Sequence, residues 1–256
     1  MRKHLLTLAT IGLITGSAHA AVTSTTTHGP EATSLNSSIA VGDLLSGLIG
    51  SELTGDQGWH PANTDPLDRL PAFTDDGGIR GTGLTGLMND FPGAGNPAKL
   101  VAYDLGGTFD IGRIQILSGN NGKDGRVFST TVVNYSTDGG NSFALLGYFQ
   151  SDPSGTLNDG QQWGSTLVEI FDDSSSTLLA GVTHLQFNLF AVDNTGNQMR
   201  DPFDGVNPYT GLDDGLTAAF VSPLIFEIDV IAVPEPTTLV LLGLGALLLW
   251  RRRQLV

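Results

Sequence analysis

The stretch VTHLQFNLF, residues 182–190, decides the fold of this chain. Apolar and polar side chains alternate along it: Leu185, Phe187 and Leu189 form one set, and His184, Gln186 and Asn188 form the other. Successive side chains of a β-strand point to opposite faces of a sheet, so this alternation predicts a half-buried strand.

Short runs of similar kind recur along the chain, separated by Gly, Asn and Asp. They are Leu100–Leu105, Ile111–Leu117, Val127–Tyr135, Phe143–Phe149, Thr166–Phe171, Val182–Val192 and Leu224–Ile231. In the last run Glu227 and Asp229 share one face, and Phe226, Ile228 and Val230 share the other. Many short strands between turn residues predict one all-β domain, a jelly-roll β-sandwich, over residues 39–232. Residues 21–38 are rich in Thr and Ser and show no apolar period, so we expect a flexible lead-in there.

The N-terminus carries an export pattern. A basic start at Arg2 and Lys3 precedes the apolar stretch Leu5–Gly16, and Ala18 and Ala20 fit a small-residue cleavage site. This order is typical of a secretory signal peptide, and the apolar stretch is shorter than the roughly 20 residues that span a membrane. We therefore expect residues 1–20 to be a signal peptide.

The C-terminus carries a second sorting pattern. Pro234, Glu235 and Pro236 precede the apolar run Thr237–Trp250, and a basic cluster follows it: Arg251, Arg252 and Arg253. As a helix the run would reach about 21 Å, short of the roughly 30 Å hydrocarbon core. The positive-inside rule keeps the arginines in the cytoplasm, so a helix inserted here stops transfer with the bulk of the chain exported.

Motif, short apolar helix and Arg cluster together resemble the PEP-CTERM sorting signal of Gram-negative bacteria that make exopolysaccharide. The resemblance covers residues 233–256 and implies that an exosortase-type membrane protease recognises Pro234, Glu235 and Pro236 and removes the tail. It also implies transient membrane insertion through the C-terminal helix, followed by display on the cell surface or release into the extracellular matrix. A plain C-terminal anchor is the alternative, although such an anchor is ordinarily longer.

The chain is acidic and free of cysteine. Its 12 Lys and Arg stand against 26 Asp and Glu, and five of the basic residues and one acidic residue lie in the two terminal segments, which leaves the body at about −18. Nucleic-acid binders present basic patches, so the acidic body argues against a nucleic-acid partner and we expect none. The charge suits either a Ca²⁺-binding protein or simple solubility. Without cysteine the chain has neither disulfides nor thiolate chemistry.

The middle of the chain resembles the discoidin, or coagulation-factor C-type, domain, which has the galactose-binding-like jelly roll. The similarity rests on Tyr103–Gly106, Ile111–Ile114 and Asn134–Phe143, with the turn Thr74–Gly77 and the closing strand Phe226–Val230. It implies a structural Ca²⁺ held by Asp75 or Asp76 and by Glu227. Carboxylates are suitable ligands for this ion, whereas an Asx turn and a solvated strand residue are the alternative interpretation.

Carbohydrate binding is a second hypothesis, with an extracellular polysaccharide as partner. Sugar sites combine an aromatic platform with planar polar side chains. The loop Ser118–Arg126 supplies polar groups, and Trp163 supplies a ring in another expected loop. The candidate ligand-binding residues are Asn120, Asn121, Lys123, Arg126 and Trp163.

Catalytic patterns are missing from the sequence. It contains neither a G-x-S-x-G elbow nor an H-E-x-x-H motif. Gly81–Gly86 matches G-x-G-x-x-G but follows a loop and opens no expected helix, so a dinucleotide site is not indicated. We therefore expect an exported, non-enzymatic binding or structural module. A polysaccharide-acting hydrolase and an adhesin with protein partners are the alternatives.

Overall fold

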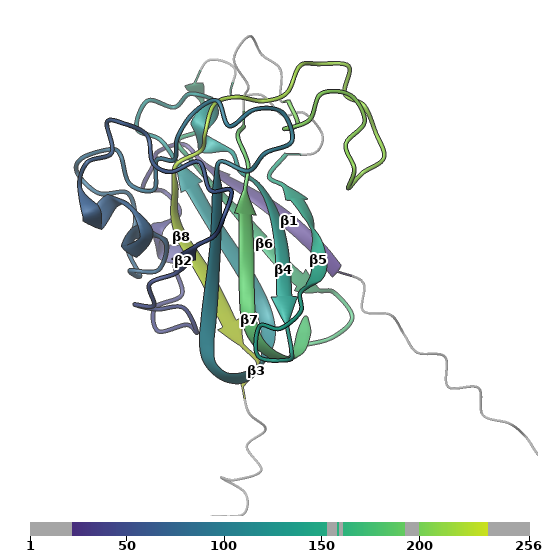
Figure 1. Cartoon of the computed structure of the whole chain (residues 1–256). Helices are drawn as coiled ribbons and strands as arrows, with labels where there is room; N and C mark the ends of the chain where they lie inside the picture. The colour runs from purple at the N-terminus through teal and green to yellow at the C-terminus, as the bar shows by residue number, and fades with distance from the viewer. Residues whose placement is uncertain (1–21, 153–157, 159–160, 193–199, 235–256) are drawn as a thin grey trace, which may run out of the picture.

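The computed structural model describes residues 22–152, 158, 161–192 and 200–234. The expected signal peptide and the tail from Glu235 onward lie outside these residues. The prediction of an all-β protein is confirmed, because the strands pair throughout in antiparallel fashion (Figure 1). They are β1 Val22–Gly29, β2 Ser51–Glu52, β3 Lys99–Gly119, β4 Thr130–Ser136, β5 Ala144–Gln150, β6 Ser165–Asp172, β7 Leu179–Leu189 and β8 Ile225–Ala232. The described helices are short 3₁₀ turns: η1 Asn36–Ser38, η2 Pro66–Asp68, η3 Leu70–Phe73 and η4 Gly125–Val127.

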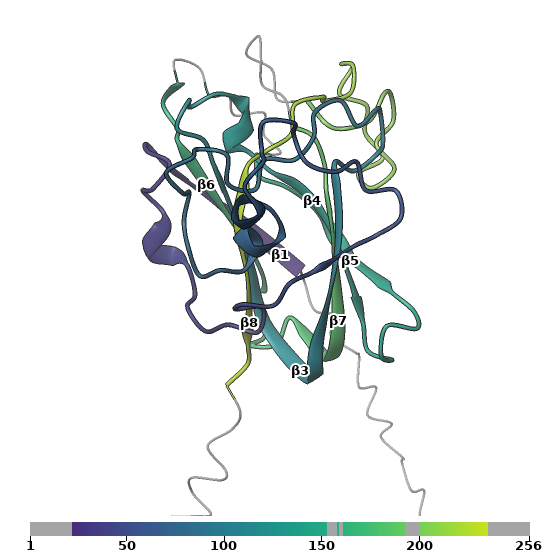
Figure 2. The same cartoon turned by 60° about the vertical axis from the view of Figure 1, so that its left-hand side comes forward.

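Strand β3 belongs to both layers of the sandwich. Its first part, from Lys99 to Asp104, pairs with β7, and Val101 and Ala102 also pair with β2. Its last part, from Arg113 to Gly119, pairs with β6 and, up to Ser118, with β8. One layer therefore holds β2, β3, β7, β4 and β5, and the other holds β1, β6, β3 and β8. Figure 2 shows β3 turning between the two layers, whose facing side chains form the main hydrophobic core.

The sequence predicted two strands, Leu100–Leu105 and Ile111–Leu117, where the structure has one. The pairing register shifts between Asp104 and Phe109, and Gly106 adopts a φ of 70°. A glycine reaches this left-handed conformation without steric cost, so the strand bends here and continues into the second layer. The glycine pair that looked like a break is the corner of the sandwich.

The lead-in expected over residues 21–38 contains strand β1. All of its residues, from Val22 to Gly29, are in register with β6. Four of these eight residues are Thr, and β-branched side chains suit a pleated edge strand. The Thr-rich composition had suggested flexibility, but pairing with β6 supplies the backbone hydrogen bonds that an isolated polar segment lacks.

Strand β8 is buried on both faces, although its alternation suggested one solvated face. Glu227 and Asp229 have no exposed surface. Two loop segments cover them: the backbone N–H of Gly77 donates to Glu227, and that of Ala40 donates to Asp229. The alternation was read correctly, but the polar face is packed against other loops of the chain.

The two ends of the sandwich differ. The upper end in Figure 1 carries the long loops 53–98, 120–129 and 200–224. The lower end carries the bend of β3, the short turns 137–143 and 173–178, and the exit of the chain at Pro234. Within the described ranges no helix is long and apolar enough to cross a membrane.

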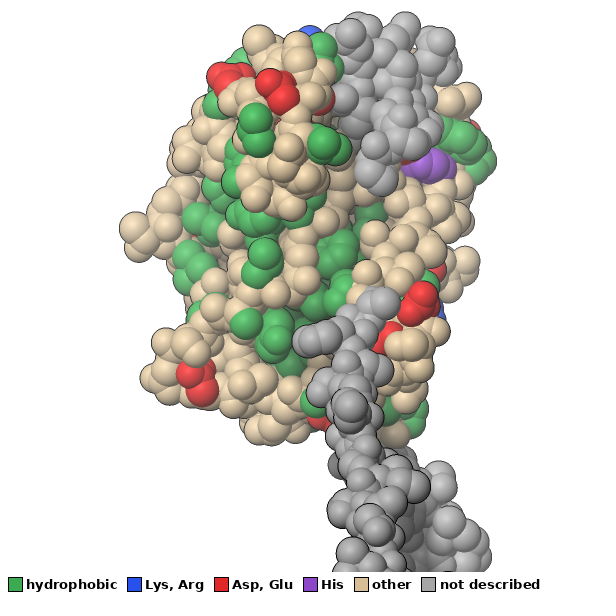
Figure 3. Space-filling model, turned by 90° about the vertical axis from the view of Figure 1, so that its right-hand side faces the viewer, with side chains coloured by type: hydrophobic (Ala, Val, Ile, Leu, Met, Phe, Trp, Pro, Cys, Tyr) green, Lys and Arg blue, Asp and Glu red, His purple; other side chains and the backbone are tan. Residues whose placement is uncertain are grey.

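The side of the molecule that carries β1 and β5 has an apolar middle. Figure 3 shows hydrophobic side chains gathered there and acidic side chains nearer the two ends. Each of these two strands exposes an apolar side chain, Val22 on β1 and Leu145 on β5. Exposed apolar residues of this kind are common on protein surfaces and need no ligand to explain them.

Candidate functional site

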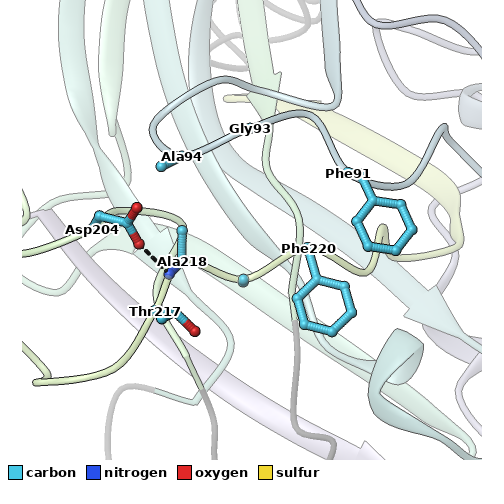
Figure 4. A pocket seen from close by; sticks show the side chains of 8 residues that line it. Phe91, Gly93, Ala94, Asp204, Thr217, Ala218 and Phe220 are labelled. Atoms are coloured by element: carbon cyan, nitrogen blue, oxygen red, sulfur yellow. Dashed lines mark hydrogen bonds between the residues drawn. The ribbon is translucent and has the colours of Figure 1, made fainter.

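Two loops meet at the upper end and enclose an open hollow of about 350 Å³. Backbone hydrogen bonds join them, from the Phe91 N–H to the Phe220 carbonyl at 2.9 Å and from the Gly95 N–H to the Pro202 carbonyl at 2.7 Å. The rings of Phe91 and Phe220 stack with their centroids 5.2 Å apart. Figure 4 shows this ring pair on one side of the hollow and Asp204 and Ala218 on another. Phe91, Gly93, Ala94, Asp204, Thr217, Ala218, Ala219 and Phe220 line the hollow.

Phe91 is held in an unusual conformation. Its φ is 59°, in the left-handed region that bulky side chains rarely occupy, and its side chain is 73% exposed. Such strain persists only where the surrounding structure imposes it, and it occurs preferentially at functional sites. A strained backbone that presents an aromatic ring to solvent therefore makes Phe91 a candidate residue of a binding surface.

The residue before Phe91 anchors this loop. Asp90 accepts two hydrogen bonds from the Arg126 guanidinium, at 2.8 and 2.9 Å, and a third from the Ser222 N–H at 2.9 Å. Burial opposes ionisation of Asp90, but the hydrogen bonds from Arg126 and Ser222 outweigh it and hold the pKa of the carboxyl below its usual value. A bidentate Arg–carboxylate pair has fixed geometry, so it positions the Phe91 loop against the segment around Ser222.

Asp204 lines the hollow and is the only ionisable residue among the eight. Its carboxylate accepts a hydrogen bond from the Ala218 N–H at 2.7 Å, which ties two parts of the 200–224 loop together. A second oxygen of a carboxylate in this position can accept hydrogen bonds from hydroxyl groups of a ligand. The hollow thus combines an apolar ring platform with one acceptor.

The polar loop that the sequence singled out is built into the protein itself. Asn120 donates to Asp124 at 2.7 Å, and Lys123 donates to Glu31 at 2.7 Å. Arg126 is committed to Asp90. Asn121 is exposed at the tip of the loop. Each of these polar side chains except Asn121 therefore has a partner within the chain.

Trp163 does lie beside this loop. The side-chain amide of Asn158 donates to the Lys123 carbonyl at 2.6 Å and to the Trp163 carbonyl at 2.9 Å. The indole stacks on the His28 ring, with centroids 5.3 Å apart. The structure thus brings the predicted Trp and the predicted loop together, with the Trp ring packed against β1.

A cluster of five carboxylates lies around β8, and we call it the acidic cluster. Its members are Asp43, Asp75, Asp76, Glu227 and Asp229. The Gly77 N–H donates to the Glu227 Oε2 at 3.0 Å, and the same N–H contributes a hydrogen bond to Asp75. Asp76 accepts from the Ser46 hydroxyl at 2.6 Å, and Ser46 also donates to Asp43 at 3.0 Å. The turn residues predicted for a metal site and Glu227 thus belong to one region of the structure.

Burial and mutual repulsion shift the titration of this cluster. Desolvation, followed by the charge of Asp229, raises the pKa of Glu227 to about 9. Desolvation also raises the pKa of Asp229 to about 7, against the opposing hydrogen bond from the Ala40 N–H. Burial raises the pKa of Asp43 and of Asp75 as well. At neutral pH the ionised form of the cluster is therefore poorly compensated.

The cluster fits a hard cation in its chemistry. Glu227 Oε1 and Asp229 Oδ1 are buried and accept no hydrogen bond. Oxygen atoms of this kind are the ligands that Ca²⁺ takes, from carboxylates and carbonyls alike. In the part of the chain that the structure describes, no group of three or more His, Asp or Glu side chains is placed so that it could hold a metal ion. A cation here would therefore draw on fewer carboxylates together with neutral oxygen donors.

The sequence did not point to Phe91 or Phe220. The two residues are far apart in the chain and share no periodic pattern. Phe91 precedes Pro92, which disfavours a helical backbone at Phe91 but does not predict a left-handed one. The aromatic pair becomes visible only when the two loops are seen side by side.

Comparisons with known proteins identify the C-terminal sorting motif. For the β-sheet domain they give a weak structural similarity. A family model of the PEP-CTERM protein-sorting motif matches residues 232–253. A crystal structure of the C-terminal domain of a chitobiase from Bacteroides fragilis is similar at 16% identity and a TM-score of 0.29, over 53% of this chain. The match spans 63% of that domain's length. No curated protein matches the chain.

The fold and the motif together define the class: an all-β protein that carries a PEP-CTERM sorting signal. This signal implies export and recognition by an exosortase, with a surface or extracellular destination.

Proposed function

We propose that this protein is a non-enzymatic binding module of a Gram-negative bacterium, displayed on the cell surface or released into an exopolysaccharide matrix. The exosortase removes its tail after Pro234, Glu235 and Pro236 are recognised, with the Arg251–Arg253 cluster on the cytoplasmic side. The observation that carries the binding role is the exposed Phe91 ring, which is carried by a strained backbone and stacks on Phe220 beside an open hollow.

The composition of the hollow favours a sugar ligand. The CH faces of a sugar ring pack on aromatic rings, while its hydroxyl groups need fixed polar partners. The ring pair offers the first and Asp204 the second. Glycoside hydrolysis ordinarily requires two carboxyl groups at defined separation, and the lining residues supply one. This supports binding over turnover, with the hydrolase as the alternative.

A glycan array with the secreted protein tests the proposal. We expect Phe91→Ala and Phe220→Ala to weaken polysaccharide binding at least tenfold, because Phe91 supplies the exposed ring and Phe220 supplies the ring stacked against it. Leu145→Ala is the matched control, since it removes an exposed apolar side chain from β5. Release of reducing ends from a polysaccharide would establish the hydrolase. Binding to no glycan, together with specific binding to a surface protein, would establish the adhesin.

Phe91→Gly refines the test by separating stability from binding. Glycine accepts a φ of 59° without strain, so this variant should be at least as stable as the parent chain while losing the ring. Loss of glycan binding at undiminished stability would show that the Phe91 ring serves binding and not folding. Retained binding would remove Phe91 from the site.

We also propose that the acidic cluster binds Ca²⁺ as a structural ion, held by Glu227 and by one carboxylate of the turn, Asp75 or Asp76, together with neutral oxygen donors. The bound ion would neutralise the buried carboxylates and fix the loop segments that cover β8. The unpartnered buried oxygens of Glu227 and Asp229 support this proposal. Repeating the glycan array with a chelator shows whether sugar binding depends on the ion.

The sorting proposal has its own measurement. Mass spectrometry of the mature protein should find a C-terminus that lacks Arg251–Arg253. An intact C-terminus in the exported protein would contradict removal of the tail and support a permanent anchor.

A further inference from the structure

The end of β8 leads directly into the sorting motif. Ile231 and Ala232 are in register with Arg113 and Ile111 of β3. The Val233 N–H then donates to the Asp110 carbonyl at 2.8 Å, and Pro234, the first residue of the motif, follows and is exposed. The motif thus begins at the residue directly after Val233, whose N–H makes this backbone hydrogen bond to β3.

The receiving side of this contact is firmly held. The Asp110 carboxylate accepts a hydrogen bond from the Gly181 N–H at 2.8 Å, and the Ile111 carbonyl accepts one from the Leu178 N–H at 2.8 Å. A side chain at Gly112 would meet the Ser176 carbonyl at 3.0 Å. The bend of β3 is therefore fixed between β7, the turn before it and the end of β8.

A hollow of about 410 Å³ lies beside this exit. The end of β6 and the following turn contribute Phe171, Ser175 and Ser176 to its wall, and Val233 and Pro234 contribute from the C-terminal segment. The residues that precede the motif are thus part of the surface of the folded lower end and do not form a free linker.

This arrangement constrains a protease that acts on the motif. Thr237, where the apolar run begins, is three positions after Pro234, and a fully extended chain covers at most about 10 Å over three positions. Proteases bind extended segments, whereas the backbone of Ile231–Val233 is already engaged with β3. Cleavage near such a segment follows its local opening.

We propose that the lower end of the sandwich gates its own sorting: residues 231–233 must detach from β3 before the membrane protease processes the motif. The proposal rests on the tail removal proposed above and adds the step that limits its rate. The surface around Asp110, Ser176 and Pro234 is then the surface that meets the protease. A sandwich whose lower end opens readily is processed fast, and one whose lower end is locked is processed slowly.

Lengthening the connection tests the gate in one direction. Four residues, Gly-Ser-Gly-Ser, inserted between Val233 and Pro234 of the full-length chain move the motif about 13 Å from the fold. In a bacterium that carries the exosortase, pulse-chase labelling should show the processed form appearing at least fivefold faster. The same insertion at Gly211, in an exposed upper loop, should leave the rate unchanged. An unchanged rate with the insertion before Pro234 would overturn the gate.

Locking the strand tests it in the other direction. Arg113 and Ile231 face each other in the β3–β8 ladder, and antiparallel partners are close enough for a disulfide. The chain has no cysteine of its own, so Arg113→Cys with Ile231→Cys forms one defined bridge in an oxidising compartment.

We expect the bridged variant to be processed at least fivefold more slowly, and reductant to restore the rate. Each single cysteine variant controls for the substitutions themselves. Processing of the bridged form at the parental rate would overturn the gate while leaving tail removal intact. Absence of processing in the parent chain would instead contradict tail removal itself.

Discussion

Two groups of buried charge in this molecule contrast sharply. Lys99 has no exposed surface, and its ammonium group lies 2.8 Å from Glu52, 2.9 Å from Asp56 and 3.9 Å from the centroid of the Trp59 ring. Glu227 and Asp229 are equally buried, but their neighbours in the acidic cluster are other carboxylates. The first group contains its counter-charges, and the second accumulates charge of one sign.

The difference teaches what each group needs. A buried ion pair with good geometry is complete, and removing one partner leaves the other charge buried without compensation. Buried carboxylates without a cation either take up protons or bind a metal ion. The charge of Lys99 is therefore compensated within the protein, by Glu52 and Asp56. The negative charge of the acidic cluster needs protons or a bound cation to compensate it.

The largest expected effect comes from breaking the complete group. Lys99→Met removes the buried cation and leaves Asp56, which is 9% exposed, facing Glu52. Loss of one partner of a buried pair costs about 3–5 kcal/mol, so the free energy of unfolding should fall by that amount. Urea unfolding followed by circular dichroism measures it. A loss below about 1 kcal/mol would show that the pair is solvated in solution.

The next largest effect is expected when Ca²⁺ binds to the acidic cluster. Ca²⁺ at about a hundred times its dissociation constant stabilises the native state by about 2.7 kcal/mol, which for a domain of this size corresponds to about 5–10 °C in Tm. Differential scanning calorimetry with Ca²⁺ and with chelator measures the shift. Asp75→Asn and Glu227→Gln should remove it. Asp104→Asn, at an exposed carboxylate of the lower end, should preserve it.

If the calorimetric shift is the same in Glu227→Gln as in the parent chain, the ion binds elsewhere. Mg²⁺ is the useful comparison ion, because it demands near-octahedral geometry and gives up its waters reluctantly. A shift with Ca²⁺ that Mg²⁺ does not reproduce indicates a site with protein oxygens as the main ligands.

Protons should complete the same cluster when the metal is removed. The pKa of Glu227 is raised to about 9 and that of Asp229 to about 7, so between pH 4 and these values the native state binds more protons than the unfolded chain. The contribution of these two carboxyl groups to the free energy of unfolding is therefore largest below about pH 4, and it is lost as the pH rises toward 9. Each carboxyl contributes a slope of up to about 1.4 kcal/mol per pH unit.

Chelator-treated protein, unfolded in urea at a series of pH values, reveals this slope. Glu227→Gln carries no charge at any pH, so its stability should decline less steeply than that of the parent chain. Among the other charged groups of the region, Arg80 lowers the pKa of Asp75, whereas the charges of Asp43 and Asp76 raise the pKa of Asp229. Identical slopes in the two proteins would show that Glu227 is ionised and solvated at neutral pH.

The fold was largely predictable from local pattern. Strict alternation in residues 182–190 predicted β7, because a period of two has few other structural explanations. The two runs now joined in β3 were separated in the prediction, since glycine ordinarily ends a strand and only tertiary pairing turned Gly106 into a corner. Strand β1 was missed because its Thr-rich sequence gains a regular structure only from β6.

The sites were less predictable, for a physical reason. Stacking of Phe91 on Phe220 and burial of Lys99 between Glu52 and Asp56 join segments far apart in the chain, and no short-range pattern encodes them. Asp75 and Glu227 were paired through resemblance to a family, and the structure places both against the Gly77 N–H. Arg126 was predicted as a ligand-binding residue because the sequence does not show that Asp90 is its partner.

The smallest expected effect comes from breaking an ion pair that is exposed to solvent. Lys123 donates to Glu31 at 2.7 Å, but the Glu31 side chain is 65% exposed. Solvent screens such a pair, so Lys123→Met should change the free energy of unfolding by less than about 1 kcal/mol, against several for the same substitution at Lys99. The same variant tests the predicted polar loop. Glycan binding that falls tenfold in Lys123→Met at unchanged stability would move the binding surface from Phe91 to the loop Ser118–Arg126, whereas unchanged binding leaves Lys123 with its local contact to Glu31.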